Sequence, residues 1–267
     1  MLVSFFGNWN PNYRDAHEIL TFSPFCAIAL TMPRKARIDA PGALQHIIVR
    51  GIEKKNIFRD AMDKNAFLKR FGRVLSETLT ACYAWVLLDN HAHLLLRTGA
   101  TPIATVMRRV LTGYAQYFNR RHKRHGQLFQ NRYKSILCEE DPYFLELVRY
   151  IHLNPVRAGM VKGLKTLNGY RFSGHAVLMG RHTREWQDSG YVLRNFAESE
   201  EDAKKGYQAF VRKGLGQGKR AELTGGGLIR SAGGWAAVKA LRSADVRIKS
   251  DERILGSSQF VEKALTK

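Results

Sequence analysis

The feature that most constrains the fold is a pair of strand-like runs joined by two turn-forming residues. Residues 82–88 read CYAWVLL, residues 91–97 read HAHLLLR, and Asp89-Asn90 stands between them. Asp and Asn favour tight turns. A two-residue connection can only join antiparallel strands, because parallel strands need a crossover of a dozen or more residues. The sequence therefore predicts a hairpin at the centre of an antiparallel sheet.

Helical and strand-like patterns alternate around this hairpin. Apolar residues at helical spacing predict three helices, and short β-rich runs predict two further strands. The helices are expected over 64–80, 102–122 and 141–154, and the strands over 45–50 and 133–138. In the third helix Asp141 is a candidate N-cap, Pro142 suits the first turn, and Pro155 is expected to end it. The pattern predicts a compact α+β domain rather than a doubly wound parallel one.

Composition divides the chain into three parts. Residues 1–31 form an N-terminal extension, with Met32 as an alternative start of translation. Residues 32–180 carry the patterned domain, and residues 181–267 form a mostly helical extension with a helix expected over 199–212 and Gly- and Lys-rich linkers. No apolar run has the length of a membrane span. The three cysteines are far apart and form no CxxC pair, which disfavours a zinc ribbon or a disulfide framework.

The charge of the chain indicates a polyanionic partner. Lys and Arg total 43 against 23 acidic residues, a net charge of +20. Nucleic acid is the leading partner and an anionic membrane surface the alternative. The tract 120–134, RRHKRHGQLFQNRYK, holds six Lys or Arg and no acid. Cations mixed with aromatic rings suit single-stranded or hairpin nucleic acid, although a charged run is also compatible with a solvated face. The DNA-binding candidates are Arg120, Arg121, Lys123, Arg124, Phe129, Arg132, Tyr133 and Lys134.

His91 and His93 are candidates for binding a metal. They alternate on a predicted strand, so both imidazoles project from the same face. Taken alone, two histidines at this spacing are weak support for a metal site.

Tyr150 and Asn154 stand four residues apart on the third predicted helix, hence on one face. An Asn154 oxygen would supply a third metal ligand and would bring the Tyr150 hydroxyl close to the metal. The alternative is a core tyrosine and a helix C-cap before proline. On periodicity alone this alternative is favoured.

Several separated motifs resemble one known family. They are DNHAHLLL at 89–96, VRYIHLNPV at 148–156, YFNRR at 117–121 leading to GQLFQNRYKS at 126–135, and MPR at 32–34 leading to HIIVRG at 46–51. Together they resemble the REP-associated tyrosine transposases, which belong to the single-tyrosine HUH (His-hydrophobic-His) transposase superfamily. The resemblance covers about residues 32–180.

The resemblance implies a ferredoxin-like HUH nuclease fold and a DNA transesterase. In such a protein His91, His93 and Asn154 would bind Mg²⁺ or Mn²⁺. Tyr150 would attack a phosphate of single-stranded DNA near a REP-type hairpin, leaving a 5′-phosphotyrosine and a free 3′-OH. Ala92 is smaller than the apolar residue common between the histidines of this family.

Four other tyrosines compete for the role of nucleophile: Tyr114, Tyr117, Tyr133 and Tyr143. None is followed by an amide residue four positions later and then by a proline.

Two other functions remain open. One is a non-catalytic hairpin-binding protein domesticated from a transposase. The other is a replication-initiator or relaxase type of HUH nuclease, in which a further histidine such as His152 would join the site. The expected protein is cytoplasmic and nucleoid-associated, a monomer or homodimer, with no membrane partner.

Overall fold

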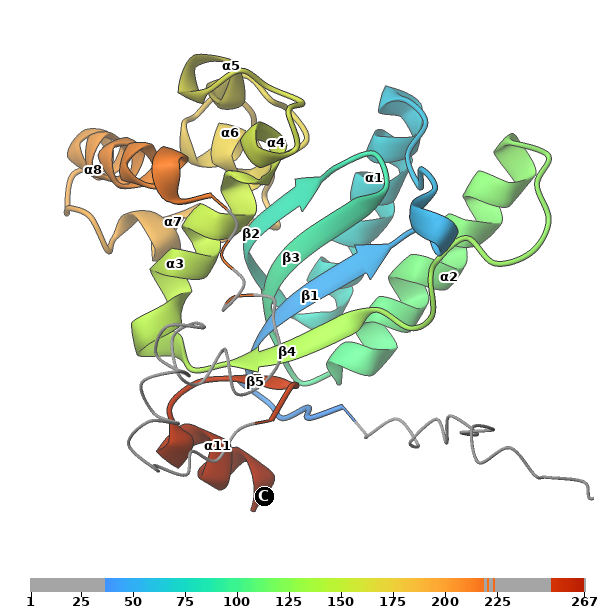
Figure 1. The fold of residues 1–267 in the computed structure, drawn as a ribbon, viewed down its shortest axis with the longest axis horizontal. Coiled ribbons are helices and arrows are strands. Elements are labelled where there is room, and N and C mark those ends of the chain that lie inside the picture. Colours follow the sequence, from blue (N-terminus) through green and yellow to red (C-terminus); the bar gives the residue numbers. More distant parts are fainter. Residues whose placement is uncertain (1–36, 219, 221–222, 224–250, 267) are drawn as a thin grey trace, which may run out of the picture. The chain divides into compact units, whose positions relative to one another are not determined.

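The computed structural model describes residues 37–218, 220, 223 and 251–266, all within one compact unit, Arg37–Lys267 (Figure 1). The extension 1–31, with Cys26, and the linker 225–227 lie outside the described residues. The other two cysteines, Cys82 and Cys138, are buried and unbridged, as expected for reduced core thiols.

The described strands form one sheet in the order β2-β3-β1-β4-β5. β1 pairs antiparallel with β3 and β4, and β2 pairs antiparallel with β3. Together with one helix after β1 and one after β3, this is the βαββαβ arrangement of a ferredoxin-like domain, so the predicted α+β fold and its hairpin are confirmed. The strands are β1 (Leu44–Arg50), β2 (Ala81–Leu87), β3 (His91–Arg97), β4 (Lys134–Cys138) and β5 (Ile254–Leu255).

β5 was not predicted. It pairs parallel with β4, opposite Leu137 and Cys138, and makes the sheet mixed. A strand of two residues is too short to show the alternation by which strands are predicted from sequence, and its partner lies more than one hundred residues earlier in the chain. The C-terminal extension therefore contributes to the sheet as well as adding helices.

The helices confirm most of the predicted pattern, with bounds shifted by one to three residues. None of those in the described part of the chain is long and apolar enough to cross a bilayer. The helices are α1 (Ala61–Thr78), α2 (Ile103–Arg121), α3 (Glu140–His152), α4 (Asn154–Arg157), α5 (Leu164–Asn168), α6 (Gly174–Leu178), α7 (Ser189–Leu193), α8 (Glu200–Lys213), α11 (Ser258–Leu265), and the 3₁₀ turns η1 (Ile52–Lys54) and η2 (Leu215–Gln217).

The two faces of the sheet are covered by different helices (Figure 1). Ala92, Leu94 and Leu96 of β3 point into a hydrophobic cluster with α1 and α2. Leu95 points the opposite way, into a second cluster with α3. Because side chains alternate along a strand, His91 and His93 share the α3 face with Leu95. Ala92 is fully buried on the α1 and α2 face.

The third predicted helix differs from the observed one at both ends: its N-cap is Glu139, and Asp141 lies in its first turn. We expected a helix over 141–154 that Pro155 stops, but α3 ends at His152 and Pro155 lies in the first turn of α4. Proline is tolerated there because the first turn needs no N–H donor. The helical path therefore continues past Pro155 after a break at Leu153.

The domain boundary expected at Gly180 stays a prediction. Helix α8 nevertheless packs close to α3, because Tyr207 and Val211 belong to the same hydrophobic cluster as Leu147 and Ile151. Ser199 caps α8: its hydroxyl accepts the N–H of Asp202.

Candidate active site

The β2–β3 turn is held from several sides. The Leu88 N–H donates to the His91 carbonyl at 2.9 Å, which closes the turn. The Asp89 carbonyl accepts the N–H of Ile57 at 2.8 Å, and its carboxylate pairs with the Lys64 ammonium at 2.9 Å. These contacts fix where β3 begins, and β3 begins with the histidine pair.

His91 and His93 lie side by side on the α3 face of the sheet, with ring centroids 5.2 Å apart. Burial and the positive charge of Arg50 lower the pKa of His91 to about 4. Burial lowers the pKa of His93 well below its usual value, and His46 and other neighbouring cations act in the same direction. Both imidazoles are therefore neutral at neutral pH, the state in which a ring nitrogen can bind a metal.

The Nδ1 atoms of both histidines, here called the inner ring nitrogens, each contact a neighbouring side chain. The Asn90 Oδ1 lies 2.6 Å from His91 Nδ1. An amide oxygen only accepts, so His91 carries its proton on Nδ1 and its lone pair on Nε2. His46 of β1 also contacts His93, with Nε2 lying 3.0 Å from His93 Nδ1, and the tautomers of the two rings decide which nitrogen donates. Partners of this kind orient metal-binding histidines.

Tyr150 and Asn154 approach the histidines from α3 and α4. The Tyr150 ring stands edge-on to the rings of His93 and His46, with centroids 5.9 and 6.1 Å away. Asn154 Nδ2 donates to the Tyr150 carbonyl at 2.8 Å and to the Ile151 carbonyl at 3.4 Å. The Ile151 carbonyl would otherwise need the N–H that Pro155 lacks, so the Asn154 side chain satisfies carbonyls at the end of α3, although the C-cap residue is Leu153. The Asn154 side chain uses only its amide nitrogen for this, and the amide oxygen remains for another role.

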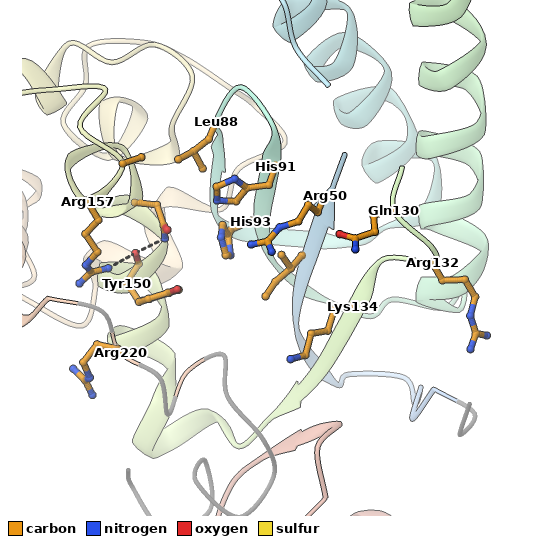
Figure 2. A pocket seen from close by; sticks show the side chains of 13 residues that line it. Arg50, Leu88, His91, His93, Gln130, Arg132, Lys134, Tyr150, Arg157 and Arg220 are labelled. Carbon is orange, nitrogen blue, oxygen red and sulfur yellow. Dashed lines mark hydrogen bonds between the residues drawn. The ribbon is translucent and has the colours of Figure 1, made fainter. Parts of the chain in front are cut away.

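All four predicted catalytic and metal-binding residues line one cavity of about 710 Å³ (Figure 2). Figure 2 shows Tyr150 on one side of it, the histidines on β3 above, and Lys134 on β4 across from Tyr150. Five of the lining side chains are cationic, and none is acidic. The lining residues are Ile48, Arg50, Leu88, His91, His93, Gln130, Arg132, Lys134, Tyr150, Asn154, Arg157, Ala158 and Arg220.

The donor set fits a divalent cation. Two neutral imidazoles and an amide oxygen line the same cavity, and these are ligand types that divalent transition metals accept. In the described part of the chain no three His, Cys, Asp or Glu side chains form a metal cluster. A metal here would therefore need the Asn154 amide oxygen as a further ligand.

The basic tract is divided between structural and exposed positions. Arg121 pairs with Asp60 at 2.6 Å and with the buried Asp63 at 2.5 Å. Arg124 holds its own loop through Asn119 Oδ1 at 3.0 Å. These two arginines are engaged within the protein, so their predicted DNA contacts would compete with existing bonds.

The aromatic members of the tract also pack inward. Phe129 lies against the α1 and α2 cluster, and the Arg37 guanidinium lies 3.8 Å from the centre of the Tyr133 ring. Of the eight DNA-binding candidates, Arg132 and Lys134 line the cavity, whereas Arg120 and Lys123 are exposed away from its lining.

The competing residues lie elsewhere. Tyr114 is fully buried and donates its hydroxyl to the Ile57 carbonyl at 2.6 Å. His152 is also fully buried, with Nδ1 lying 2.7 Å from the Tyr207 hydroxyl. Tyr150 is the tyrosine that lines the cavity in the described part of the chain, and His152 does not reach it.

Several residues of this site were not predicted from the sequence. Arg50 and His46 stand at alternate positions of β1, a signal that was readable once that strand was predicted. Arg157 follows the recognised motif by one residue, and nothing local linked Gln130 or Arg220 to the cavity.

Comparisons with known proteins bear on this region. Residues 42–154 match the family model described as IS200-like transposase. The chain has no match among curated protein sequences.

Two solved structures are similar in fold. One is a REP-associated tyrosine transposase bound to a REP hairpin, with 19% identity, a TM-score of 0.45, and coverage of 58% of this chain and 91% of that one. The other is a Deinococcus radiodurans R1 protein described as a transposase, with 15% identity, a TM-score of 0.32, and coverage of 45% and 95%.

The family match runs from the start of β1 to Asn154 and so contains both histidines, Tyr150 and Asn154. Over residues 42–154 the chain is therefore similar to the IS200-like transposases.

Proposed function

We propose that this protein is a metal-dependent single-stranded DNA endonuclease and strand transferase that uses Tyr150 as its nucleophile. The observation that carries the proposal is the convergence of Tyr150, His91, His93 and Asn154 on one cationic cavity. A phosphodiester is an anion, so a cavity lined by five cations and no acid suits it.

His91, His93 and Asn154 would hold Mg²⁺ or Mn²⁺. When bound, such an ion polarises a phosphate oxygen and offsets the charge that develops during attack on phosphorus. The protein's own part is to keep both imidazoles neutral by burial and to orient them through Asn90 and His46.

In the proposed reaction the Tyr150 oxygen forms a bond to phosphorus as the bond from phosphorus to the 3′ oxygen breaks. The products are a 5′-phosphotyrosine and a free 3′-OH, and the phenolic proton is balanced by the proton that the 3′ oxygen gains. No oxidant or energy cofactor is required, because one phosphodiester replaces another. The reaction is therefore reversible, and the 3′-OH of another strand can take over the 5′ end.

The proposed target is single-stranded DNA beside a REP-type hairpin. The sequence motifs that resemble REP-associated transposases support this target. Arg132 and Lys134 extend the cationic lining onto β4, where they would follow the strand. We also keep the proposal of a catalytic domain over 32–180 with an appended segment over 181–267, in a monomer or homodimer associated with the nucleoid.

The decisive experiment is incubation of the full chain with labelled single-stranded hairpin DNA and Mn²⁺, followed by mapping of the modified residue. We expect an adduct on Tyr150, and no adduct with Tyr150→Phe at unchanged DNA affinity. An adduct formed by Tyr150→Phe would refute the assignment of the nucleophile. Hairpin binding without cleavage by the unaltered chain would instead favour the domesticated, non-catalytic binding protein.

A further inference from the structure

Arg157 is a cation that contacts the backbone of Tyr150, the candidate nucleophile. It is the last residue of α4, and Nη1 donates to the Tyr150 carbonyl at 3.0 Å. Its guanidinium carbon lies 5.0 Å from the centre of the Tyr150 ring. The same carbonyl also accepts a hydrogen bond from Asn154 Nδ2. Arg157 and Asn154 therefore share one acceptor on Tyr150. Figure 2 shows Arg157 and His93 on different sides of Tyr150.

The charge of Arg157 is not neutralised within the described residues. No carboxylate of the described chain lies within salt-bridge distance of it, and its Nε is buried and has no hydrogen-bond partner there. Its arginine neighbours differ in this respect. Arg149 and Arg220 both pair with Glu146, at 2.6 and 2.9 Å.

Burial makes this position costly for a lone cation. Desolvation lowers the pKa of Arg157, and the charges of Arg220 and Arg149 act in the same direction, whereas the Tyr150 hydroxyl acts in the opposite one. A partly buried guanidinium without a carboxylate is stabilised when an anion binds to it. The side chain lines the cavity, so an anion can reach it.

We propose that Arg157 binds a phosphate of the DNA strand next to Tyr150, as a phosphate subsite separate from the metal ligands. This inference rests on the proposed function and deepens it. Arginine offers several N–H donors in one plane, which matches phosphate oxygens better than an ammonium does. With one N–H of Nη1 engaged on the Tyr150 carbonyl and Nε buried, the donors that remain for the phosphate are Nη2 and the second N–H of Nη1.

A purely structural role is the competing explanation. Arginine near a helix C-terminus can bind terminal carbonyls and stabilise the helix, and Arg157 does bind a carbonyl of the last turn of α3. A cap would affect the melting temperature of the protein. It would not affect DNA affinity or the dependence of that affinity on salt.

The test measures equilibrium binding of a fluorescent 20-nucleotide single strand by anisotropy, in EDTA and over a range of salt concentrations. All proteins carry Tyr150→Phe, so no covalent trapping occurs. Arg157→Gln and Arg157→Lys are compared with Arg194→Gln, which removes an exposed charge that does not line the cavity.

We expect Arg157→Gln to bind roughly tenfold more weakly near 0.1 M salt, and the slope of log affinity against log salt to fall by about 0.7, the change for one lost phosphate contact on a single strand. Arg157→Lys should keep the slope and bind a few-fold more weakly, because it keeps the charge and loses the paired donors. Arg194→Gln should bind as the Tyr150→Phe parent does.

Parental affinity and slope in both Arg157 variants, with a lowered melting temperature, would overturn the proposal in favour of the cap. If Arg157→Gln does not fold, Arg157→Lys decides alone, since only the phosphate subsite predicts its weaker binding. The outcome is separable from that of the proposed function. A missing adduct in the unaltered chain would refute catalysis by Tyr150 and leave the salt dependence unchanged.

Discussion

The described chain holds two groups of neighbouring histidines, and they differ in their surroundings: one group lines the cavity and the other lies in the core. In the first, His91 and His93 have rings 5.2 Å apart and line the cavity. In the second, His152 and His175 have rings 6.0 Å apart and surround the Tyr207 hydroxyl. Burial lowers the pKa of all four. Neither burial nor a shifted pKa therefore distinguishes a candidate site from a structural cluster.

The direction of the hydrogen bonds does distinguish them. His175 Nε2 lies 2.8 Å from Asn168 Oδ1, which only accepts, so His175 Nδ1 must accept the Tyr207 hydroxyl proton. His152 Nδ1 then donates to the Tyr207 oxygen, and its lone pair stays on Nε2 inside the core. In the first group the inner nitrogens are bonded and the outer ones meet a cavity. Of the two groups, the first is the one that lines a cavity open to a ligand from solution.

The largest expected difference between the two groups is in metal-dependent chemistry. We expect His93→Ala to lower the rate of adduct formation by roughly a thousandfold or more, because loss of the ion's charge costs several kcal/mol in the transition state. Single-turnover adduct formation at saturating Mn²⁺ measures the rate, and calorimetric titration measures metal affinity.

His152→Gln is the matched control for this change. It removes a buried imidazole from the tyrosine helix α3, in the His152 and His175 group, so metal affinity and rate per folded molecule should stay within a few-fold of the unaltered chain. Equal losses in both variants would show that the two groups do not differ in function.

The second largest effect is the response of the His152 and His175 group to acid. Burial lowers the pKa of His175 to about 4 from 6.5. Between pH 6.5 and pH 4, His175 is protonated in the unfolded chain but stays neutral in the folded chain. The folded state therefore loses stability as the pH falls from 6.5 to 4. For this group the loss is about 3 kcal/mol between pH 7 and pH 4.

Urea unfolding at a series of pH values measures this loss. His175→Gln should show a pH dependence shallower by about that amount, with a lower stability at pH 7. An unchanged pH dependence would show that His175 is protonated equally in both states.

The features that could be predicted from the sequence are those formed by residues close together in the chain. The hairpin at Asp89-Asn90 was predictable because its strands and turn lie within sixteen residues. The pairing of His46 with His93 joins positions 47 residues apart, and no periodicity encodes it. The same limit explains Arg121, which was expected to contact DNA from its place in a basic run, yet finds Asp60 and Asp63 through the packing of α1 on α2. Local patterns predict which face a side chain takes, and only the tertiary fold decides its partner.

A smaller effect tests whether the first group needs its orienting partner. Asn90→Ala removes the acceptor that holds the proton on His91 Nδ1. Loss of such a partner commonly weakens metal binding by about 10- to 100-fold, and we expect a loss in this range by calorimetric titration with Mn²⁺. Asn90→Asp restores an acceptor and should recover most of the affinity. Weakening by Asn90→Asp as large as that by Asn90→Ala would contradict the orienting role.

The smallest expected effect concerns the buried His152 and His175 group and leaves the rate of adduct formation unchanged. Tyr207→Phe removes the hydroxyl that serves both His152 and His175, so two buried nitrogens lose their partner at no change in apolar volume. We expect the free energy of unfolding to fall by about 2 kcal/mol. Tyr117→Phe is the control, because in the described part of the chain no hydrogen bond of its hydroxyl is recorded, and it should cost little. Adduct formation per folded molecule should be unchanged in both variants. A specific loss of rate with Tyr207→Phe at full folding would mean that α8, through Tyr207, sets the position of the tyrosine helix, and the two histidine groups would then act together rather than separately.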